Sequence, residues 1–340
     1  MNKRILIGLI VLVVGAIVAY LLVGKILWSP NVNSSESAYE LYIPTDASYQ
    51  QVIDSLNAKQ IIRDMTSFAT VAKIKSFDKA RPGRYVITSD MSNMQIINKL
   101  RSGSQDAESV VINNIRLISD LAGKASRYFE TDSLSFVNFL TSPETANKYG
   151  FVPENFLAMF IPNTYEMFWT ATPEKFADRM KKEFDKYWTD DRLAKIQKNQ
   201  LDKTQAYILA SIVEKESNYD PERPTIAGVY LNRLKAGEKL QADPTVVFAV
   251  GDFTLQRVLY SHLKTDSPYN TYMYTGLPPG PICMPSLASL EAVVNASEHK
   301  YMFFCAKPDN SGIHAFAETY ADHQKNADAF AAWMNSLNIK

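Results

Sequence analysis

Two glutamates end a short apolar segment, and their spacing can place one of them in an apolar environment. Residues Ala210–Ser217 read Ala-Ser-Ile-Val-Glu-Lys-Glu-Ser. Apolar residues of the segment 204–217 recur at helical spacing, and this stripe extends to Glu216. Glu214 lies about 200° around the same helix. The stripe consists of Ile208, Leu209, Ile212 and Val213, and the side of Glu214 carries Tyr207, Ala210 and Ser211.

Glu216 is therefore a candidate general acid. Burial disfavours the charged form of a carboxyl group and raises its pKa, so the group can donate a proton near neutral pH. Cleavage of a glycosidic bond requires such a donor. The alternative is an amphipathic helix whose last turn frays, because a buried glutamate is rare. We expect Glu214 to be a surface or supporting partner of Lys215 or Arg233.

Several motifs follow this helix in a fixed order. Together with the glutamate helix they resemble the endolytic murein transglycosylases, the YceG-like family, over roughly residues 205–325. The motifs are Val-Tyr-Leu-Asn-Arg-Leu at 229–234, Leu-Gln-Ala-Asp-Pro-Thr-Val at 240–246, Tyr-Asn-Thr-Tyr at 269–272 and Gly-Leu-Pro-Pro-Gly-Pro-Ile at 276–282. An ordered set of motifs is more specific than any one of them.

The resemblance implies an endolytic peptidoglycan lytic transglycosylase with Glu216 as its acid and base. Such an enzyme cleaves the bond between N-acetylmuramic acid and N-acetylglucosamine within nascent strands. It leaves 1,6-anhydro ends and thereby terminates strand elongation, and it needs one carboxylate where most glycosidases use two. A muramidase that uses water and a non-enzymatic wall-binding or division scaffold are the alternatives.

Four residues are candidates for binding the glycan: Gln241, Asp243, Asn270 and Tyr272. Their amide, carboxylate and phenol groups suit sugar hydroxyls. Asp243 is also placed to orient Glu216, although Pro244 beside it equally favours a helix N-cap. The prolines at 278, 279 and 281 predict a stiff, preformed wall of the cleft.

The chain departs from the family pattern ahead of the catalytic helix. Where many members have Glu-Gly-x-x-x-Pro-Asp-Thr-Tyr, this chain has Leu157 and Asn163 in place of the two acids. Any sugar-binding role of those acids therefore does not transfer to this chain. The Pro-x-Thr-Tyr turn itself is retained.

The N-terminus predicts a membrane helix. Residues 5–24 are uncharged and match the thickness of a bilayer core. Lys3 and Arg4 precede them, which keeps residues 1–4 in the cytoplasm. No small-residue cleavage site follows, which favours a retained single-pass anchor over a signal peptide. We expect inner-membrane localisation with the catalytic domain on the periplasmic side.

Composition narrows the set of partners. The 36 basic and 36 acidic side chains balance, which argues against nucleic acid. Expected partners are peptidoglycan glycan strands, the inner membrane through residues 5–24 and a membrane-bound peptidoglycan synthase. No cofactor or metal is expected, because the four histidines lack zinc-site spacing. Cys283 and Cys305 face an oxidising side, and a disulfide and two separate thiols both remain open.

The predicted fold is α+β. After the anchor we expect a linker at 25–38, a LysM-like subdomain at 39–103, a helical connecting region at 104–200 and a mixed α+β lytic transglycosylase catalytic domain at 201–340. A faint repeat supports the subdomain: residues 43–56 recur as 87–100, with Asp46, Ser48, Asp90 and Ser92 placed to cap helices. A strand near 301–306 and a closing helix at 321–339 complete the prediction.

Overall fold

The computed structural model describes residues 3–255 and 257–336, and these form two compact units. The first unit comprises residues up to Val110 together with the short stretches 128–131 and 165–172. The second comprises residues 111–127, 132–164 and those from Pro173 onward. The predicted connecting region at 104–200 is therefore not a separate body, because most of it belongs to the same unit as the predicted catalytic domain.

The chain begins with helix α1 (Lys3–Trp28), which is long and apolar enough over Leu6–Trp28 to cross a membrane. Its apolar side chains are exposed along most of the helix, as lipid contact requires. The last turn differs, since Ile26 and Leu27 pack against the core of the first unit. The Asn93 amide also donates to the carbonyl of Ile26 at 3.1 Å.

Part of the segment predicted as a linker at 25–38 packs into the first unit. Asn31 and Val32 are buried in the first unit. The Asn31 amide donates to Oδ1 of Asn93 at 2.7 Å, and its backbone N–H donates to the Met91 carbonyl at 3.0 Å. The composition of this segment is typical of a free linker and gave no sign of the packing. In the folded unit, the buried Asn31 satisfies backbone groups that would otherwise be hydrogen-bonded to water.

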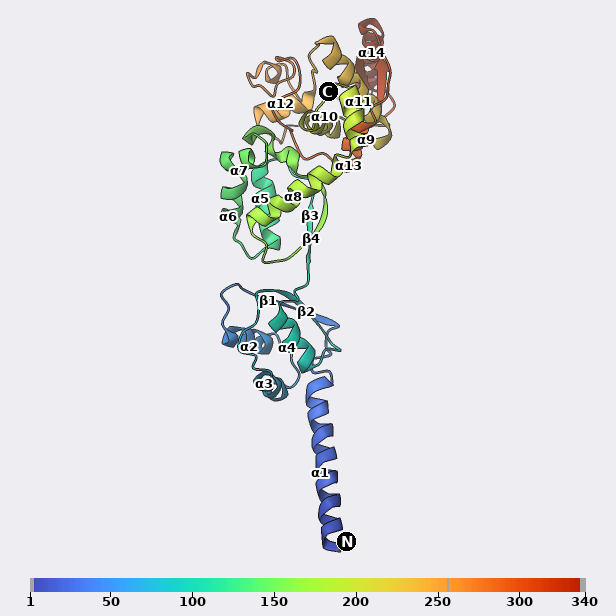
Figure 1. Cartoon of the computed structure of the whole chain (residues 1–340). Helices are drawn as coiled ribbons and strands as arrows, with labels where there is room; N and C mark the ends of the chain where they lie inside the picture. The colour runs from blue at the N-terminus through green and yellow to red at the C-terminus, as the bar shows by residue number, and fades with distance from the viewer. Residues whose placement is uncertain (1–2, 256, 337–340) are drawn as a thin grey trace. The chain divides into compact units, whose positions relative to one another are not determined.

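A pair of antiparallel strands and the helices beside it form most of the rest of the first unit (Figure 1). Strand β1 (Ala38–Ile43) pairs with β2 (Gly83–Thr88), with Leu41 opposite Tyr85. Helices α2 (Tyr49–Ala58) and α3 (Met65–Ile74) connect these strands, and α4 (Asn93–Ser102) follows β2. The order strand, helix, helix, strand is the one that the sequence predicted.

The faint repeat corresponds to two equivalent helix starts. Ser48 and Ser92 each cap a helix and form a capping box with the glutamine three residues later. Asp90 instead accepts from the Thr88 hydroxyl at 2.5 Å, so the capping role belongs to the two serines. The repeat thus records a local helix-start signal used twice.

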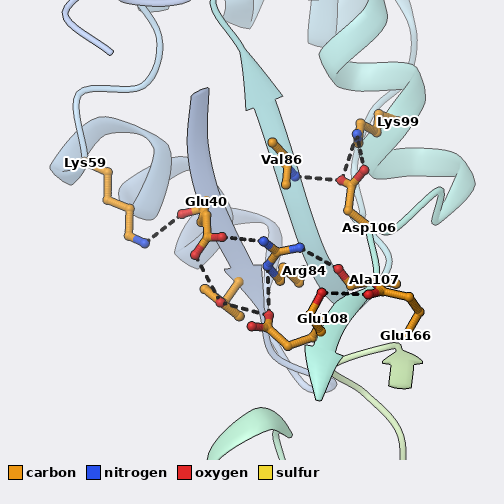
Figure 2. Close-up of polar contacts among 11 residues, drawn as sticks. Glu40, Lys59, Arg84, Val86, Lys99, Asp106, Ala107, Glu108 and Glu166 are labelled. Atoms are coloured by element: carbon orange, nitrogen blue, oxygen red, sulfur yellow. Dashed lines mark hydrogen bonds and ion pairs between the residues drawn. The ribbon is translucent and has the colours of Figure 1, made fainter. Parts of the chain in front are cut away.

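Charged residues fasten the segment after α4 to the two strands of the first unit. Figure 2 shows Arg84 between Glu40 and Glu108, with its Nε 2.9 Å from Glu108 Oε2. The Asp106 carboxylate accepts from the Val86 N–H at 2.7 Å and pairs with Lys99 at 2.8 Å. Because Arg84 is mostly buried, these partners compensate the cost of removing its charge from water.

The second unit is mainly helical. Before the glutamate helix it contains α5 (Ile118–Ala125), α6 (Ser133–Leu140), α7 (Pro143–Lys148), the 3-10 segment η2 (Pro153–Met159), α8 (Pro173–Tyr187) and α9 (Asp190–Lys198). The short strands β3 (Glu108–Ile112) and β4 (Asn163–Met167) pair with each other, and each of them is divided between the two units. Helix α8 buries Phe176, Met180 and Phe184 against the rest of this unit.

Helix α10 (Lys203–Glu216) lies at the core of the second unit. Asp202 caps it through a capping box with Gln205. Every residue from Ala206 to Val213 is buried, including Tyr207 and Ser211 on the side of Glu214. The helix is therefore not amphipathic until its last turn. It packs against α11 (Arg223–Ala236), α12 (Asp243–Val250) and α13 (Leu287–Val294).

A hairpin and a long helix end the described chain. Strand β5 (Phe303–Ala306) lies within the predicted strand, and it pairs with β6 (His314–Ala317), which the sequence analysis did not predict. Helix α14 (Tyr320–Ser336) corresponds to the predicted closing helix, whose last residues lie outside the described part. Cys283 is buried, Cys305 is partly buried, and both thiols are free.

Candidate active site

An open cavity of about 660 Å³ lies at the C-terminal end of α10, and Glu216 is part of its wall. Helix α12 and the loop that follows it supply most of the remaining wall. The apolar lining consists of Val247, Phe248, Phe253, Leu255, Val258 and Ile282. The charged lining consists of Glu216, Asp243, Arg116, Lys215 and Arg257. The cavity thus has the mixed lining that is usual for a small-molecule or sugar site.

Glu216 is held by one tyrosine. The Tyr230 hydroxyl, buried on α11, donates a short hydrogen bond to Glu216 Oε1. Burial raises the pKa of Glu216 to about 7, the Tyr230 hydrogen bond opposes the rise, and the negative charge of Asp243 adds to it. At neutral pH a large share of Glu216 is therefore protonated and can act as an acid.

Asp243 lies beside Glu216 in this cavity, and its carboxylate accepts from the Tyr272 hydroxyl at 2.6 Å. The alternative reading as a helix N-cap is wrong. Asp243 is the first residue of α12, Ala242 occupies the cap position, and no side-chain cap bond forms there. Tyr272, which the sequence also selected, therefore contacts the site through Asp243.

The other two predicted sugar ligands are placed differently. Asn270 is fully buried, and its amide donates to the carbonyls of Leu263 and Thr265. Its amide group instead shapes the loop that carries Tyr272. Gln241 is exposed with a φ of 51°, and its side-chain oxygen is 3.4 Å from Nη1 of Arg233. It does not line the cavity.

Glu214 has a structural environment that the sequence did not predict. Its Oε2 accepts from the Ser286 N–H at 3.0 Å and from the hydroxyls of Ser286 and Ser289. Arg223 lies 3.6 Å away, so neither Lys215 nor Arg233 is its partner. The carboxylate thus lies at the N-terminus of α13, where negative charge is favourable.

The proline-rich segment 276–282 contributes to the cavity wall through Ile282 alone. The Ile282 N–H donates to the buried hydroxyl of Ser211 on α10 at 3.0 Å. Pro278 and Pro279 line a separate cavity next to η2. The prediction of a stiff cleft wall therefore applies to the end of this segment only.

Gly280 marks the closest approach of this segment to its neighbours. A β-carbon at this position would overlap the Glu154 carbonyl oxygen and meet the Tyr269 hydroxyl at 2.9 Å. We expect Gly280→Ala to lower the free energy of unfolding by about 1–3 kcal/mol or more. Gly123→Ala is the matched control, because Gly123 lies in helix α5 with open space around it. Thermal unfolding should separate the two variants, and equal stability would contradict the packing described.

The sequence analysis missed Tyr230 and the wall formed after α12. Tyr230 belongs to a quoted motif, but its contact with Glu216 spans 14 positions and two helices. Leu157 is buried in the core and Asn163 accepts from the N–H of Thr164, so neither substituted position lines the cavity. Helical spacing carries no signal for contacts of this kind.

The fold and site define a class: α+β proteins in which one carboxyl group of raised pKa lines an open cavity and is suited to general acid catalysis. The chain belongs to the YceG-like family, whose model matches residues 41–329.

Known relatives agree with this membership. An endolytic murein transglycosylase of Bacillus subtilis is 29% identical over 95% of this chain and 92% of its own length. One from Streptococcus pneumoniae is 25% identical over 84% of this chain, which spans 57% of that relative. The crystal structure of a yceG-like protein from Listeria monocytogenes aligns with a TM-score of 0.54 and 27% identity, covering 86% of this chain and 99% of that chain.

Proposed function

We propose that this protein is an endolytic peptidoglycan lytic transglycosylase that cleaves the bond between N-acetylmuramic acid and N-acetylglucosamine within glycan strands. The names of the relatives and the family support this activity. The observation that carries it is Glu216, a carboxyl group with a pKa of about 7 on the wall of an open cavity.

In the first step, protonated Glu216 donates its proton to the bridging oxygen while the bond from the anomeric carbon to that oxygen breaks. The departing sugar leaves as an alcohol, and an oxocarbenium-like centre develops on the muramic acid. The negative charge of Asp243, which lies on the same cavity wall, favours this positive charge. Its bond from Tyr272 holds the carboxylate in place.

In the second step, the 6-hydroxyl of the same muramic acid attacks the anomeric carbon. The hydroxyl proton passes to the Glu216 carboxylate, which restores the acid for another cycle. No water is consumed, and the product carries a 1,6-anhydro end. The Tyr230 hydrogen bond stabilises the carboxylate formed between the two steps.

Mass spectrometry of digested glycan strands tests this proposal. We expect anhydro ends from the wild-type chain and none from Glu216→Gln. Reducing ends would instead show a hydrolytic muramidase. Intact strands from the folded wild-type chain, with retained binding to strands, would show a wall-binding scaffold.

The first unit supports a proposed wall-binding role. Its order of strand, two helices and strand, with β1 and β2 paired antiparallel, is that of the LysM-like subdomain that the sequence predicted. In this proposal, the unit holds glycan near the membrane while the second unit cuts it. The affinity of the Glu216→Gln variant for isolated glycan strands, which it binds without cutting, would test this wall-binding role.

We further propose that α1 is a retained membrane anchor and that the enzyme acts on nascent strands next to a membrane-bound synthase, terminating their elongation. The packing of Ile26, Leu27 and Asn31 leaves no free linker between α1 and the first unit. That unit is therefore held at the membrane surface, on the outer side.

A secreted form without residues 1–24 should cut purified strands but fail to restore normal glycan length in cells that lack the protein. This boundary keeps Ile26 and Leu27, which belong to the folded unit. Replacing residues 5–24 with an unrelated membrane helix is the control, and it should restore glycan length. Full rescue by the secreted form would contradict the need for tethering.

A further inference from the structure

Three basic side chains line the same cavity as Glu216: Arg116, Lys215 and Arg257. They come from three different parts of the second unit, namely the loop after β3, the last turn of α10 and the loop after α12. The proposed acid chemistry uses none of them. These three basic side chains outnumber the two carboxyl groups that line the cavity, Glu216 and Asp243.

None of the three cations forms an ion pair with an Asp or Glu among the residues that the structure describes. Other arginines of the second unit are paired: Arg192 lies 2.6 Å from Glu291, and Arg223 lies 2.7 Å from Asp220. Cations gathered in a cavity without carboxylate partners repel each other, so an anion that entered it would be attracted.

Arg116 is positioned by an aromatic ring. Its guanidinium lies 4.0 Å from the centroid of the Phe253 ring, and the side chain is partly buried. A guanidinium stacked in this way keeps its N–H edge free to bind a carboxylate through two hydrogen bonds. Lys215 and Arg116 both lie near the Cys283 thiol. Burial raises the pKa of this thiol to about 12, and the positive charges of the two residues oppose that rise.

We propose that Arg116, Lys215 and Arg257 form a cationic arm of the active site that binds a carboxylate carried by the muramic acid. The inference rests on the proposed function and specifies its substrate. The sugar rings of the glycan are neutral, so its negative charge lies on the lactyl group of muramic acid or on a peptide attached there. Binding that charge would fix which sugar meets Glu216.

Three soluble glycans test the arm against the full-length protein in detergent. One carries peptides, one has been stripped of peptides by an amidase and bears free lactyl carboxylates, and one has these carboxylates converted to neutral methyl amides. We expect Arg116→Gln to lower kcat/KM on carboxylate-bearing glycan by about 10- to 100-fold. The neutral glycan should be cut equally by both proteins.

Two further variants make the result specific. Arg127→Gln removes the same charge from an exposed position outside the cavity and should leave all rates unchanged. Arg116→Lys keeps the charge without the two-pronged geometry and should recover part of the loss. A loss confined to peptide-bearing glycan would place the anion on the peptide, and a loss on stripped glycan would place it on the lactyl group. An equal loss on neutral glycan, or no loss on either anionic glycan, would overturn the proposal.

A binding measurement separates this inference from the catalytic one. Calorimetric titration of Glu216→Gln with a muramic acid-containing tetrasaccharide, in acid and methyl amide forms, needs no cleavage. We expect the acid form to bind at least about 10-fold more tightly than the methyl amide form, and Arg116→Gln in that background to reduce this difference. Equal affinity for the two forms would overturn the arm. Failure of the wild-type chain to cut any glycan would overturn only the proposed function.

Discussion

Replacing Glu216 with glutamine should abolish glycan cleavage, with a rate about a thousandfold or more below that of the wild type. Glutamine keeps the size of the side chain and can still accept the Tyr230 hydrogen bond, but it cannot deliver or recover a proton. Both steps of the proposed reaction need that proton. Release of anhydro ends from purified strands, measured by mass spectrometry, gives the rate.

Stability provides the folding control for this variant. The pKa of Glu216 in the folded protein, about 7, is above its ordinary value of 4.5, so its protonated form favours folding. This contribution is complete below 4.5 and is lost as pH rises through 7. Glu216→Gln cannot ionise, so it should unfold at a higher temperature than the wild type at pH 8. An inactive variant that has also unfolded would say nothing about catalysis.

Glu214→Gln is the matched comparison on the same helix turn. Its cleavage rate should stay within a few-fold of the wild-type rate, because Glu214 accepts hydrogen bonds from Ser286 and Ser289 and does not line the cavity. It should lose about 1–3 kcal/mol of stability, since a neutral amide oxygen in place of Oε2 accepts these hydrogen bonds without the carboxylate charge and no longer pairs with Arg223. Loss of cleavage in a stable Glu214→Gln protein, with cleavage retained in Glu216→Gln, would reverse the assignment.

The second large effect is on the pH dependence of cleavage. Burial raises the pKa of Glu216 to about 7, and the residue must begin the reaction protonated. We therefore expect kcat/KM to fall about tenfold for each pH unit above this value. Rates measured on soluble strands between pH 5 and 9, in a buffer series of constant ionic strength, define this alkaline limb.

Two neighbours should move the alkaline limb in opposite directions. Tyr230→Phe removes the hydrogen bond that favours the ionised carboxylate, so the pKa of Glu216 and the limb should move to higher pH. Asp243→Asn removes a nearby negative charge, so the limb should move to lower pH. A limb that stays in place in both folded variants would mean that another group controls the alkaline side.

The sequence by itself determined the features that depend on local order along the chain. The uncharged run at 5–24 is enough for a membrane-length helix, because the backbone satisfies its own hydrogen bonds in any apolar surroundings. The capping residues Ser48 and Ser92 act within one helical turn, which is why the repeat was visible. The helix ending at Glu216 and the family motifs are equally local.

Only the tertiary structure decided what surrounds these local elements. Glu214 and Glu216 are two positions apart in the sequence. Glu214 nevertheless accepts hydrogen bonds at the N-terminus of α13, whereas Glu216 accepts one from Tyr230 of α11. Asn270 and Tyr272 belong to one motif, but Asn270 forms hydrogen bonds within its own loop, whereas Tyr272 donates a hydrogen bond to Asp243. The sequence predicted a linker at 25–38, but Asn31 in this segment forms a hydrogen bond with Asn93, which is 62 positions away. Helical spacing says which way a side chain points, whereas packing of distant segments decides what it meets and therefore which carboxyl group keeps its proton.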